Sequence, residues 1–253
     1  MENAVMSYRL DKYLALAGIG TRSEVKAFLK KGMVTVDGQL EKKPERKISG
    51  EEIIHFQGRE ICYEEFRYLM LHKPAGVVTA TRDQKEQTVM DLITLPGKKD
   101  LFPVGRLDKD TEGLLLITND GELAHRLLSP KKHVDKCYFA RVEGPITEEH
   151  IQSFAKGLEI GDDTPTLPAR LRILSSGEIS EVEVTIQEGR YHQIKRMFEA
   201  VGSSVCYLKR LSMGSLVLDE NLEKGGFRRL TGQEIAALQK GNREETDNRE
   251  VCG

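Results

Sequence analysis

The densest group of reactive side chains lies in residues 105–115 (GRLDKDTEGLL), between two glycines that separate apolar segments. The turn presents a set of charged and hydroxyl side chains: Arg106, Asp108, Asp110, Thr111 and Glu112. Carboxylates grouped in this way can transfer a proton, attack a carbon atom or bind a cation. A calcium loop is excluded, because its twelfth position is Asn119 and the flanking segments are typical of strands. A plain surface turn remains the alternative to a catalytic turn, since Asp and Gly are common in turns.

A second chemical feature is a basic block at residues 9–47, with ten Lys or Arg residues against five Asp or Glu, a balance of +5. Arg22, Lys26 and Lys30 recur every fourth residue, which places them on one face of a predicted helix. A solvated helix face is the simpler interpretation of such a stripe. Because the basic residues continue into the following strand region, we favour a surface that binds nucleic acid.

Longer patterns follow in order along the chain: HKPAGVV, GRLDKDTEGLLLITNDGELAHRLLSP, DKCYFARV and EGRYHQIKRMFEAVG. Together they resemble the motifs of the RsuA-type family of ribosomal RNA pseudouridine synthases. The basic N-terminal block is similar to the RNA-binding domain named after ribosomal small-subunit protein four. The resemblance runs through almost the whole chain, so it is far more specific than one short motif.

The resemblance implies roles for individual residues. The aspartate of the Arg-Leu-Asp element is the catalytic nucleophile in this family, and it corresponds to Asp108. The tyrosine that stacks on the target base corresponds to Tyr138, and the basic residue that pairs with the aspartate corresponds to Lys195. Contacts to RNA or substrate are expected from a further set: Arg22, Lys26, Lys30, Arg106, Thr111, His192 and Arg196.

The implied reaction needs little beyond one carboxylate. Isomerising uridine to pseudouridine breaks the bond between ribose and a ring nitrogen, turns the uracil and rebuilds the bond at carbon five. Nothing is oxidised and nothing enters or leaves, so we expect no metal and no organic cofactor. An ionised carboxylate below the ribose can attack the anomeric carbon or remove the neighbouring proton, and the residues do not decide between these routes.

Cations and an aromatic ring are expected around the carboxylate. Burial raises the pKa of an aspartate and a nearby cation lowers it again. We expect Lys195 to pair with Asp108 directly, and Arg106 to hold the flipped-out nucleotide. Tyr138 would stack on the extruded uracil, and its hydroxyl would move a proton late in the reaction. Packing of Tyr138 in the core is the alternative.

The third motif also carries information on the target. Residues 190–210 hold five basic side chains against Glu199 alone, and we expect them to line the cleft and contact phosphates. His192 is compatible with an RNA contact, a helix cap or a packing role. The motif reads His-Gln-Ile-Lys-Arg, whereas relatives that act on large-subunit RNA tend to carry Arg-Glu-Val-Arg-Arg. It resembles the small-subunit enzyme, which predicts 16S rRNA as the partner and uridine 516 as the target.

Two other functions stay open: the same reaction on large-subunit (23S) rRNA, and a non-catalytic RNA-binding factor in ribosome assembly. The set of Arg106, Asp108, Tyr138 and Lys195 argues against the second, since a pure binder needs no carboxylate facing a phosphate-rich ligand. The substrate is then rRNA, either free or within the assembling small subunit. We expect a cytoplasmic monomer that binds no membrane.

An α+β fold is expected to position these residues. Residues 1–66 are predicted to form the RNA-binding domain: two short helices, the second begun by a capping box of Thr21 and Glu24, then a hairpin on Asp37-Gly38. A polar stretch, residues 49–58, leads into a catalytic domain at 67–240. Strands and helices mix there without regular alternation, which is typical of a mainly antiparallel sheet. Helices are predicted at 121–128, 147–157, 192–201 and 231–239, and the tail 241–253 is expected to be disordered.

Composition bounds the remaining possibilities. With 253 residues, 39% hydrophobic and 31% charged, the chain can bury a core in about two domains. Its net charge of −2 argues against indiscriminate coating of nucleic acid. No apolar run approaches the length of a membrane span, and the N-terminus lacks a signal-peptide layout. The cysteines are too far apart for paired zinc ligands and are expected to be reduced thiols: Cys62, Cys137, Cys206 and Cys252.

Overall fold

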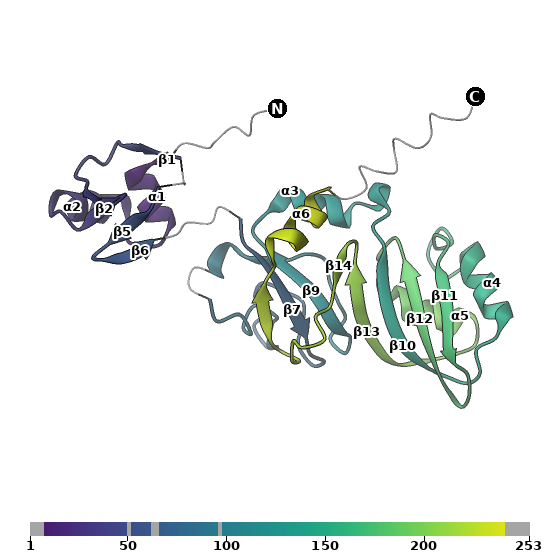
Figure 1. The fold of residues 1–253 in the computed structure, drawn as a ribbon. Helices are drawn as coiled ribbons and strands as arrows, with labels where there is room; N and C mark the ends of the chain where they lie inside the picture. The colour runs from purple at the N-terminus through teal and green to yellow at the C-terminus, as the bar shows by residue number, and fades with distance from the viewer. Residues whose placement is uncertain (1–7, 50–51, 62–65, 96–97, 241–253) are drawn as a thin grey trace, which may run out of the picture. The chain divides into compact units, whose positions relative to one another are not determined.

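A computed structural model describes residues 8–49, 52–61, 66–95 and 98–240. The chain forms two compact units, residues 1–65 and 66–253 (Figure 1). Within the described ranges Cys137 and Cys206 are free thiols, whereas Cys62, Cys252 and the tail 241–253 lie outside them. Among the described residues, no helix combines the length and the apolar composition needed to cross a lipid bilayer.

The described residues of the first unit form short elements: β1 (Tyr8–Arg9), α1 (Leu10–Leu16), α2 (Arg22–Lys30), β2 (Val34–Val36), β3 (Gln39–Leu40), β4 (Lys47–Ile48), β5 (Ile54–Phe56) and β6 (Arg59–Ile61). The predicted capping box begins α2, because the Thr21 hydroxyl accepts from the Glu24 amide and the Glu24 carboxylate accepts from the Thr21 amide at 2.8 Å. The predicted hairpin joins β2 to β3, with Asp37 and Gly38 at positive φ. Local sequence therefore determines both features.

Within the polar stretch, residues 54–56 form a strand of the first unit's sheet. β5 pairs with β2 and β6 pairs with β5, which gives the strand order β3-β2-β5-β6. Ile54 is fully buried in the same core as Leu10, Leu29 and Val34. Because the stretch is mostly polar, the sequence analysis did not predict the strand β5, which buries the side chain of Ile54.

The second unit is larger, and its described residues form these elements: β7 (Tyr68–Lys73), η1 (Lys98–Asp100), β8 (Phe102–Pro103), β9 (Glu112–Thr118), α3 (Gly121–Leu128), η2 (Pro130–Lys132), β10 (Lys136–Glu143), α4 (Glu148–Lys156), β11 (Arg170–Ser175), β12 (Ile179–Ile186), α5 (Gln193–Ala200), β13 (Val205–Met213), β14 (Leu216–Val217), β15 (Phe227–Arg229) and α6 (Gly232–Lys240). One mixed sheet runs in the order β11-β12-β10-β13-β9-β7-β15. Of the described strands in this order, only β9 and β13 pair in parallel. The predicted α+β class with a mainly antiparallel sheet is confirmed.

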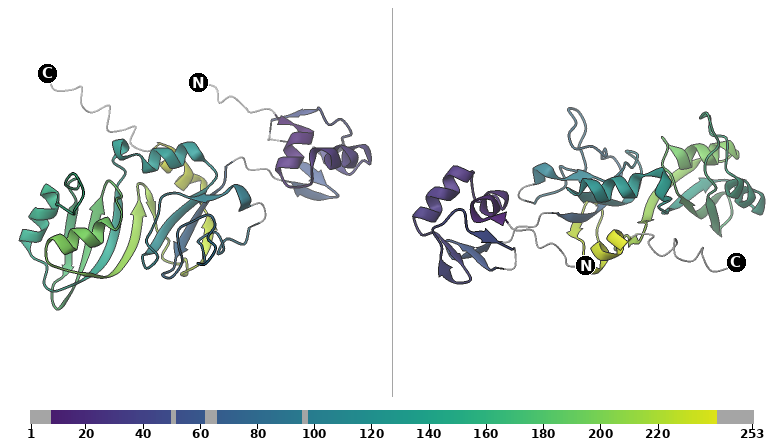
Figure 2. Two further views of the ribbon diagram at one scale, coloured as in Figure 1. Left: turned by 180° about the vertical axis from the view of Figure 1, so that it is seen from behind. Right: turned by 90° about the horizontal axis from the view of Figure 1, so that it is seen from above.

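Both faces of the sheet are covered, because its central strands are apolar on both sides. In β7, Leu69 and Leu71 enter one core, whereas Tyr68 and Met70 enter the other. The first core includes buried residues of α4 and α5, and the second includes those of α3 and α6. Figure 2 shows the backbone of the sheet and of these helices from two further directions. All four helices lie within one residue of their predicted bounds.

The parallel pairing of β9 with β13 depends on Gly113. This glycine has a φ of 105° and lies opposite Arg210 in the register. A Cβ atom at Gly113 would lie 2.6 Å from the Arg210 amide nitrogen and closer still to its carbonyl oxygen. Only glycine therefore allows the two strands to approach, and through them the two parts of the sheet to join.

The end of β7 fixes the loop that precedes β9. The Lys73 side chain is fully buried, and its Nζ donates to the carbonyls of Pro74 (3.0 Å), Lys109 (3.2 Å) and Thr111 (2.8 Å). Three acceptors require the three protons of an ammonium group. Burial lowers the pKa of Lys73 to about 8, although the nearby Asp110 and Asp108 carboxylates raise it. The group is therefore mostly protonated at neutral pH.

We expect Gly113→Ala to lower the free energy of unfolding by more than about 3 kcal/mol, because backbone strain and a backbone clash act together. Gly144→Ala is the matched control, since Gly144 also has a positive φ but open space around its Cβ position. The control should cost about 1 kcal/mol. Urea denaturation followed by circular dichroism measures both, and equal losses would contradict the close approach of β9 and β13.

The lowered pKa of Lys73 predicts that stability depends on pH. The folded chain releases this proton near pH 8, whereas the unfolded chain keeps it until about pH 10.5. Between these values the unfolded state binds more protons, so the contribution of Lys73 to the free energy of unfolding rises with pH. The gain is roughly 3 kcal/mol over the whole interval, and it is lost as the pH falls through 8.

Chemical denaturation of wild type and Lys73→Met between pH 7 and 10.5 tests this expectation. The other titrating groups are common to both proteins, so they cancel in the difference between the two free energies of unfolding. That difference should shift in favour of the wild type as the pH rises. A difference that stays constant would show that Lys73 titrates alike in the folded and unfolded chains.

Candidate active site

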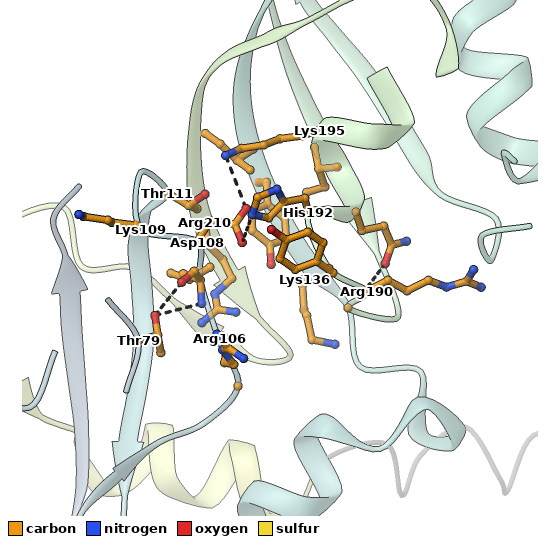
Figure 3. A pocket seen from close by; sticks show the side chains of 18 of the residues that line it. Thr79, Arg106, Asp108, Lys109, Thr111, Lys136, Arg190, His192, Lys195 and Arg210 are labelled. Atoms are coloured by element: carbon orange, nitrogen blue, oxygen red, sulfur yellow. Dashed lines mark hydrogen bonds and ion pairs between the residues drawn. The ribbon is translucent and has the colours of Figure 1, made fainter. Parts of the chain in front are cut away.

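A pocket of about 740 Å³ opens beside the loop that joins β8 to β9 (Figure 3). Its walls come from this loop, from β10, from β13 and from the start of α5. The polar and aromatic side chains that line it include Arg106, Asp108, Thr111, Lys136, Tyr138, His192, Lys195 and Arg210. A pocket of this volume is large enough for a nucleotide. The three expected catalytic residues, Asp108, Tyr138 and Lys195, therefore meet in one cavity.

Asp108 faces this pocket from a backbone that is held on both sides. On one side the Thr79 hydroxyl donates to the Leu107 carbonyl at 2.8 Å and accepts from the Leu107 amide at 3.2 Å. On the other side Lys73 holds the carbonyl of Lys109. The Asp108 side chain is 26% exposed, so a ligand in the pocket can reach it.

The other two acids of the turn have partners of their own. Asp110 accepts from Lys195 Nζ at 2.7 Å through both carboxylate oxygens. Partial desolvation raises the pKa of Asp110, but the hydrogen bonds and charge of Lys195 hold it below its ordinary value. Glu112 is buried and accepts from the Tyr207 hydroxyl at 2.7 Å and from Lys224 at 2.8 Å. Of the three acids, only Asp108 lines the main pocket.

Two side chains face Asp108 from the start of α5. Lys195 Nζ lies 3.6 Å from Asp108 Oδ2, so this lysine is shared between Asp108 and the closer Asp110 instead of pairing with Asp108 alone. His192 Nε2 lies 3.6 Å from Asp108 Oδ1. The His192 side chain does not cap the helix, and its ring stacks on Tyr191 with centroids 3.9 Å apart. The cap is therefore excluded as its role.

Tyr138 fits both interpretations that the sequence left open. It lies on β10, is only 7% exposed and packs in the first core, yet it also lines the pocket. Of the expected substrate contacts, Arg106 is exposed at the pocket and Thr111 is buried in its wall. The Thr111 hydroxyl has no hydrogen-bond partner among the described residues.

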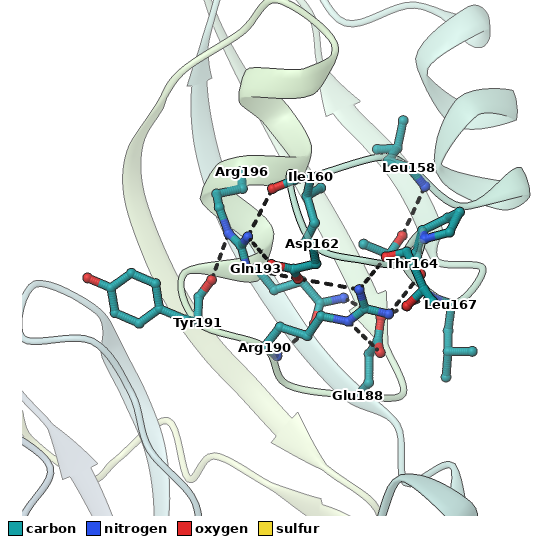
Figure 4. Close-up of polar contacts among 12 residues, drawn as sticks. Leu158, Ile160, Asp162, Thr164, Leu167, Glu188, Arg190, Tyr191, Gln193 and Arg196 are labelled. Atoms are coloured by element: carbon teal, nitrogen blue, oxygen red, sulfur yellow. Dashed lines mark hydrogen bonds and ion pairs between the residues drawn. The ribbon is translucent and has the colours of Figure 1, made fainter.

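The basic cluster at residues 190–210 is largely engaged within the fold. Arg196 donates to Asp162 at 2.7 Å and to carbonyl oxygens, and Arg190 contacts the same carboxylate at 3.3 Å (Figure 4). Arg190 also donates to the carbonyls of residues 164 and 165. Most donors of Arg190 and Arg196 are therefore not available to phosphates. Arg196, expected to contact RNA, does not line the pocket and instead ties the segment 158–167 to α5.

Several residues of the site escaped the sequence analysis. Lys73 and Lys136 stood inside the quoted patterns HKPAGVV and DKCYFARV, but no pattern distinguishes a buried lysine from an exposed one. Arg210 was expected to line the cleft and does so, but its burial to 2% exposure was not predicted. Tyr191 is 77% exposed beside His192 at the pocket. An aromatic residue next to a motif histidine was the available signal for it.

The first unit places its basic stripe as expected. Arg22, Lys26 and Lys30 are all exposed on α2, while Val25 and Leu29 are buried. Arg22 has a structural contact as well, because its Nη2 lies 3.6 Å from the buried carboxylate of Asp11. Lys26 and Lys30 form no ion pair with another described residue, which leaves both charges available to a ligand.

The residues that line the pocket could catalyse a reaction on a nucleoside bound in it. A fixed carboxylate faces the cavity, Lys195 and His192 lie beside it, and an aromatic ring forms part of the wall. Such a carboxylate can attack a sugar carbon or accept a proton from its neighbour. No group of three or more metal-binding side chains occurs within the described ranges.

Comparisons with known proteins agree with this geometry. The family model for RNA pseudouridylate synthase matches residues 67–200, and the S4 domain model matches residues 9–54. The uncharacterized RNA pseudouridine synthase YtzG of Bacillus subtilis is 47% identical over 91% of this chain and 98% of its own. Ribosomal small subunit pseudouridine synthase A of Vibrio cholerae is 44% identical over 92% of this chain and 100% of its own.

Among solved structures, a crystal structure of a pseudouridylate synthase aligns with a TM-score of 0.65 at 40% sequence identity. The alignment covers 91% of this chain and 99% of that protein. Sequence motifs, fold and pocket thus lead to the same conclusion: the chain belongs to the RNA pseudouridylate synthase family, with an S4 domain preceding the catalytic domain.

Proposed function

We propose that this protein converts one uridine of 16S rRNA, uridine 516, into pseudouridine, with Asp108 as the carboxylate that acts on the ribose. The main support for the proposed reaction is the position of Asp108. Its backbone is fixed by hydrogen bonds, and it lies in a nucleotide-sized pocket together with Tyr138 and Lys195. We place this reaction in the cytoplasm, where rRNA is made and assembled into ribosomal subunits.

The pocket supports a route in which the target nucleoside leaves its helical stack before it reacts. The uracil would enter against Tyr138, and the ribose would lie over Asp108. The carboxylate then adds to the anomeric carbon or removes the neighbouring proton, and the bond from ribose to the base nitrogen breaks. The freed base turns in the pocket, and its carbon five bonds to the anomeric carbon as Asp108 leaves that carbon or returns the neighbouring proton. Carbon five then loses its proton, and the former glycosidic nitrogen gains one.

The choice of 16S rRNA rests on the third motif. Its His192-Gln193 form resembles that of small-subunit enzymes, and several relatives that match nearly the full chain are named for the small ribosomal subunit. The same reaction on 23S rRNA is the alternative. A direct comparison of the two RNAs separates them.

We expect Asp108→Asn to abolish isomerisation while RNA affinity stays within about threefold, because Lys and Arg contacts dominate binding. Asp110→Asn is the matched control from the same turn, and it should keep most of the activity. Tritium release from uracil-labelled 16S and 23S transcripts, naked or partly assembled, measures turnover. Turnover by Asp108→Asn would exclude Asp108 as the reacting carboxylate, and modification of 23S alone would exclude the small-subunit target.

The stripe on α2 predicts how the first unit contributes to binding. Replacing Lys26 and Lys30 with Ala should weaken binding to an rRNA fragment and flatten its salt dependence by roughly 0.7 to 0.9 logarithmic units for each phosphate that is no longer neutralised. Arg22 is kept, because it also lies 3.6 Å from the buried Asp11 carboxylate, which Arg9 contacts at 3.1 Å, so its loss would disturb the fold of the unit as well. Lys42→Ala with Lys43→Ala removes the same charge elsewhere in the unit. If both double variants weaken binding equally, the stripe has no special role and total charge explains the affinity.

A further inference from the structure

Three buried side-chain atoms lack a hydrogen-bond partner among the described residues: His72 Nε2, Thr111 Oγ1 and Arg210 Nη2. Two of these residues, Thr111 and Arg210, line the pocket that contains Asp108. A buried donor without an acceptor is unfavourable, and more so when it carries a charge. Nη2 of Arg210 therefore lacks an acceptor that a ligand in this pocket can supply.

The position of Arg210 is set by the sheet. Its Nε donates to the Leu114 carbonyl at 2.7 Å, which fixes the guanidinium against β9. Arg210 lies directly opposite Tyr138 on the antiparallel neighbour β10, so the two side chains share one face. A register shift between Cys137 and Tyr138 marks a β-bulge at this point, and bulges often redirect a side chain next to an active site.

The surroundings of Arg210 suit a planar base better than a phosphate group. The guanidinium is buried beside Tyr138, and the apolar side chains of Leu107, Ile186 and Leu208 line the same pocket. Lys136 lies two residues before Tyr138 on the same face, and its pKa is lowered by burial and by the charge of Arg210. The pocket thus carries positive charge at the level of the expected base, whereas Lys195 and His192 face Asp108.

The reaction creates a negative charge where Arg210 lies. When the bond between ribose and the base nitrogen breaks, its electron pair leaves with the base. Uracil then carries one negative charge, spread over that nitrogen and the two carbonyl oxygens. This holds whether Asp108 adds to the anomeric carbon or takes the neighbouring proton. Fixed donors in a desolvated site stabilise such a developing charge strongly.

We propose that Arg210 binds a carbonyl oxygen of the target uracil and stabilises the base anion formed when the glycosidic bond breaks. This role rests on the proposed isomerisation. Arg210 acts through its charge and hydrogen bonds and transfers no proton, and the base gives an electron pair back to the sugar when carbon five bonds to the anomeric carbon. Thr111, with its unpartnered hydroxyl in the same wall, is a second donor for this ligand.

A fluorinated substrate tests the proposal. Fluorine at carbon five withdraws electrons and makes uracil a stronger acid, so its anion needs less help from Arg210. We compare Arg210→Met with wild type on an rRNA fragment carrying uridine or 5-fluorouridine at the target position. The readout is single-turnover consumption of the target nucleoside, measured by nuclease digestion and mass spectrometry, because the fluorinated carbon has no proton to release.

With uridine, Arg210→Met should react about 10²–10³-fold more slowly than wild type, with affinity within about threefold. With 5-fluorouridine the loss should be at least tenfold smaller. Lys209→Met is the matched control, since Lys209 is the neighbouring cation on β13 and does not line the pocket. It should show no dependence on fluorine, and Asp108→Asn should be inactive on both substrates.

Equal losses on both substrates would overturn the role of Arg210, as would weaker binding with an unchanged rate, which would indicate a phosphate ligand. If Arg210→Met does not fold, Arg210→Lys decides the question, because it keeps the charge and should show a smaller loss that fluorine still relieves. A wild-type protein that leaves uridine unchanged would instead refute the proposed function, so the two failures are distinguishable.

Discussion

The buried ammonium of Lys73 is the interaction on which the rest of the site depends. A buried ammonium group is tolerated in a core only when its N–H groups form hydrogen bonds. Here they donate to the carbonyls of Pro74, Lys109 and Thr111. Those carbonyls belong to the end of β7 and to the loop before β9. Lys73 therefore ties the end of β7 to the loop that carries Asp108 and supports the position of this carboxylate.

The basic residues of this protein are placed where the active site needs them, and several of them are not on the surface. The net charge of −2 hides a pocket in which cations outnumber acids. Arg190 and Arg196 both bind Asp162 and so stabilise the position of α5, which in turn presents Lys195 to the two aspartates. Some basic residues are therefore placed to contact the substrate. Others hold in position the elements that carry these contacts.

The sequence predicted the local features and missed the long-range ones. The capping box at Thr21, the hairpin at Asp37 and the four helices of the second unit follow from contacts within a few residues. Asp108 was found through the family resemblance, because spacing alone left a plain turn open. β13 and the burial of Arg210 were missed, since a strand with Lys and Arg at its centre looks like a surface segment until its partners are known.

The parallel pairing of β9 with β13 has a consequence for the synthesis of the enzyme. Asp108 leaves the ribosome early, whereas Arg210 follows only after β10, β11, β12 and α5 have been translated. Contacts between such distant segments form slowly, because a long loop must close before they are made. A nascent chain therefore has the reacting carboxylate but no complete pocket. The pocket can be complete only after β13 lies in the centre of the sheet, between β9 and β10.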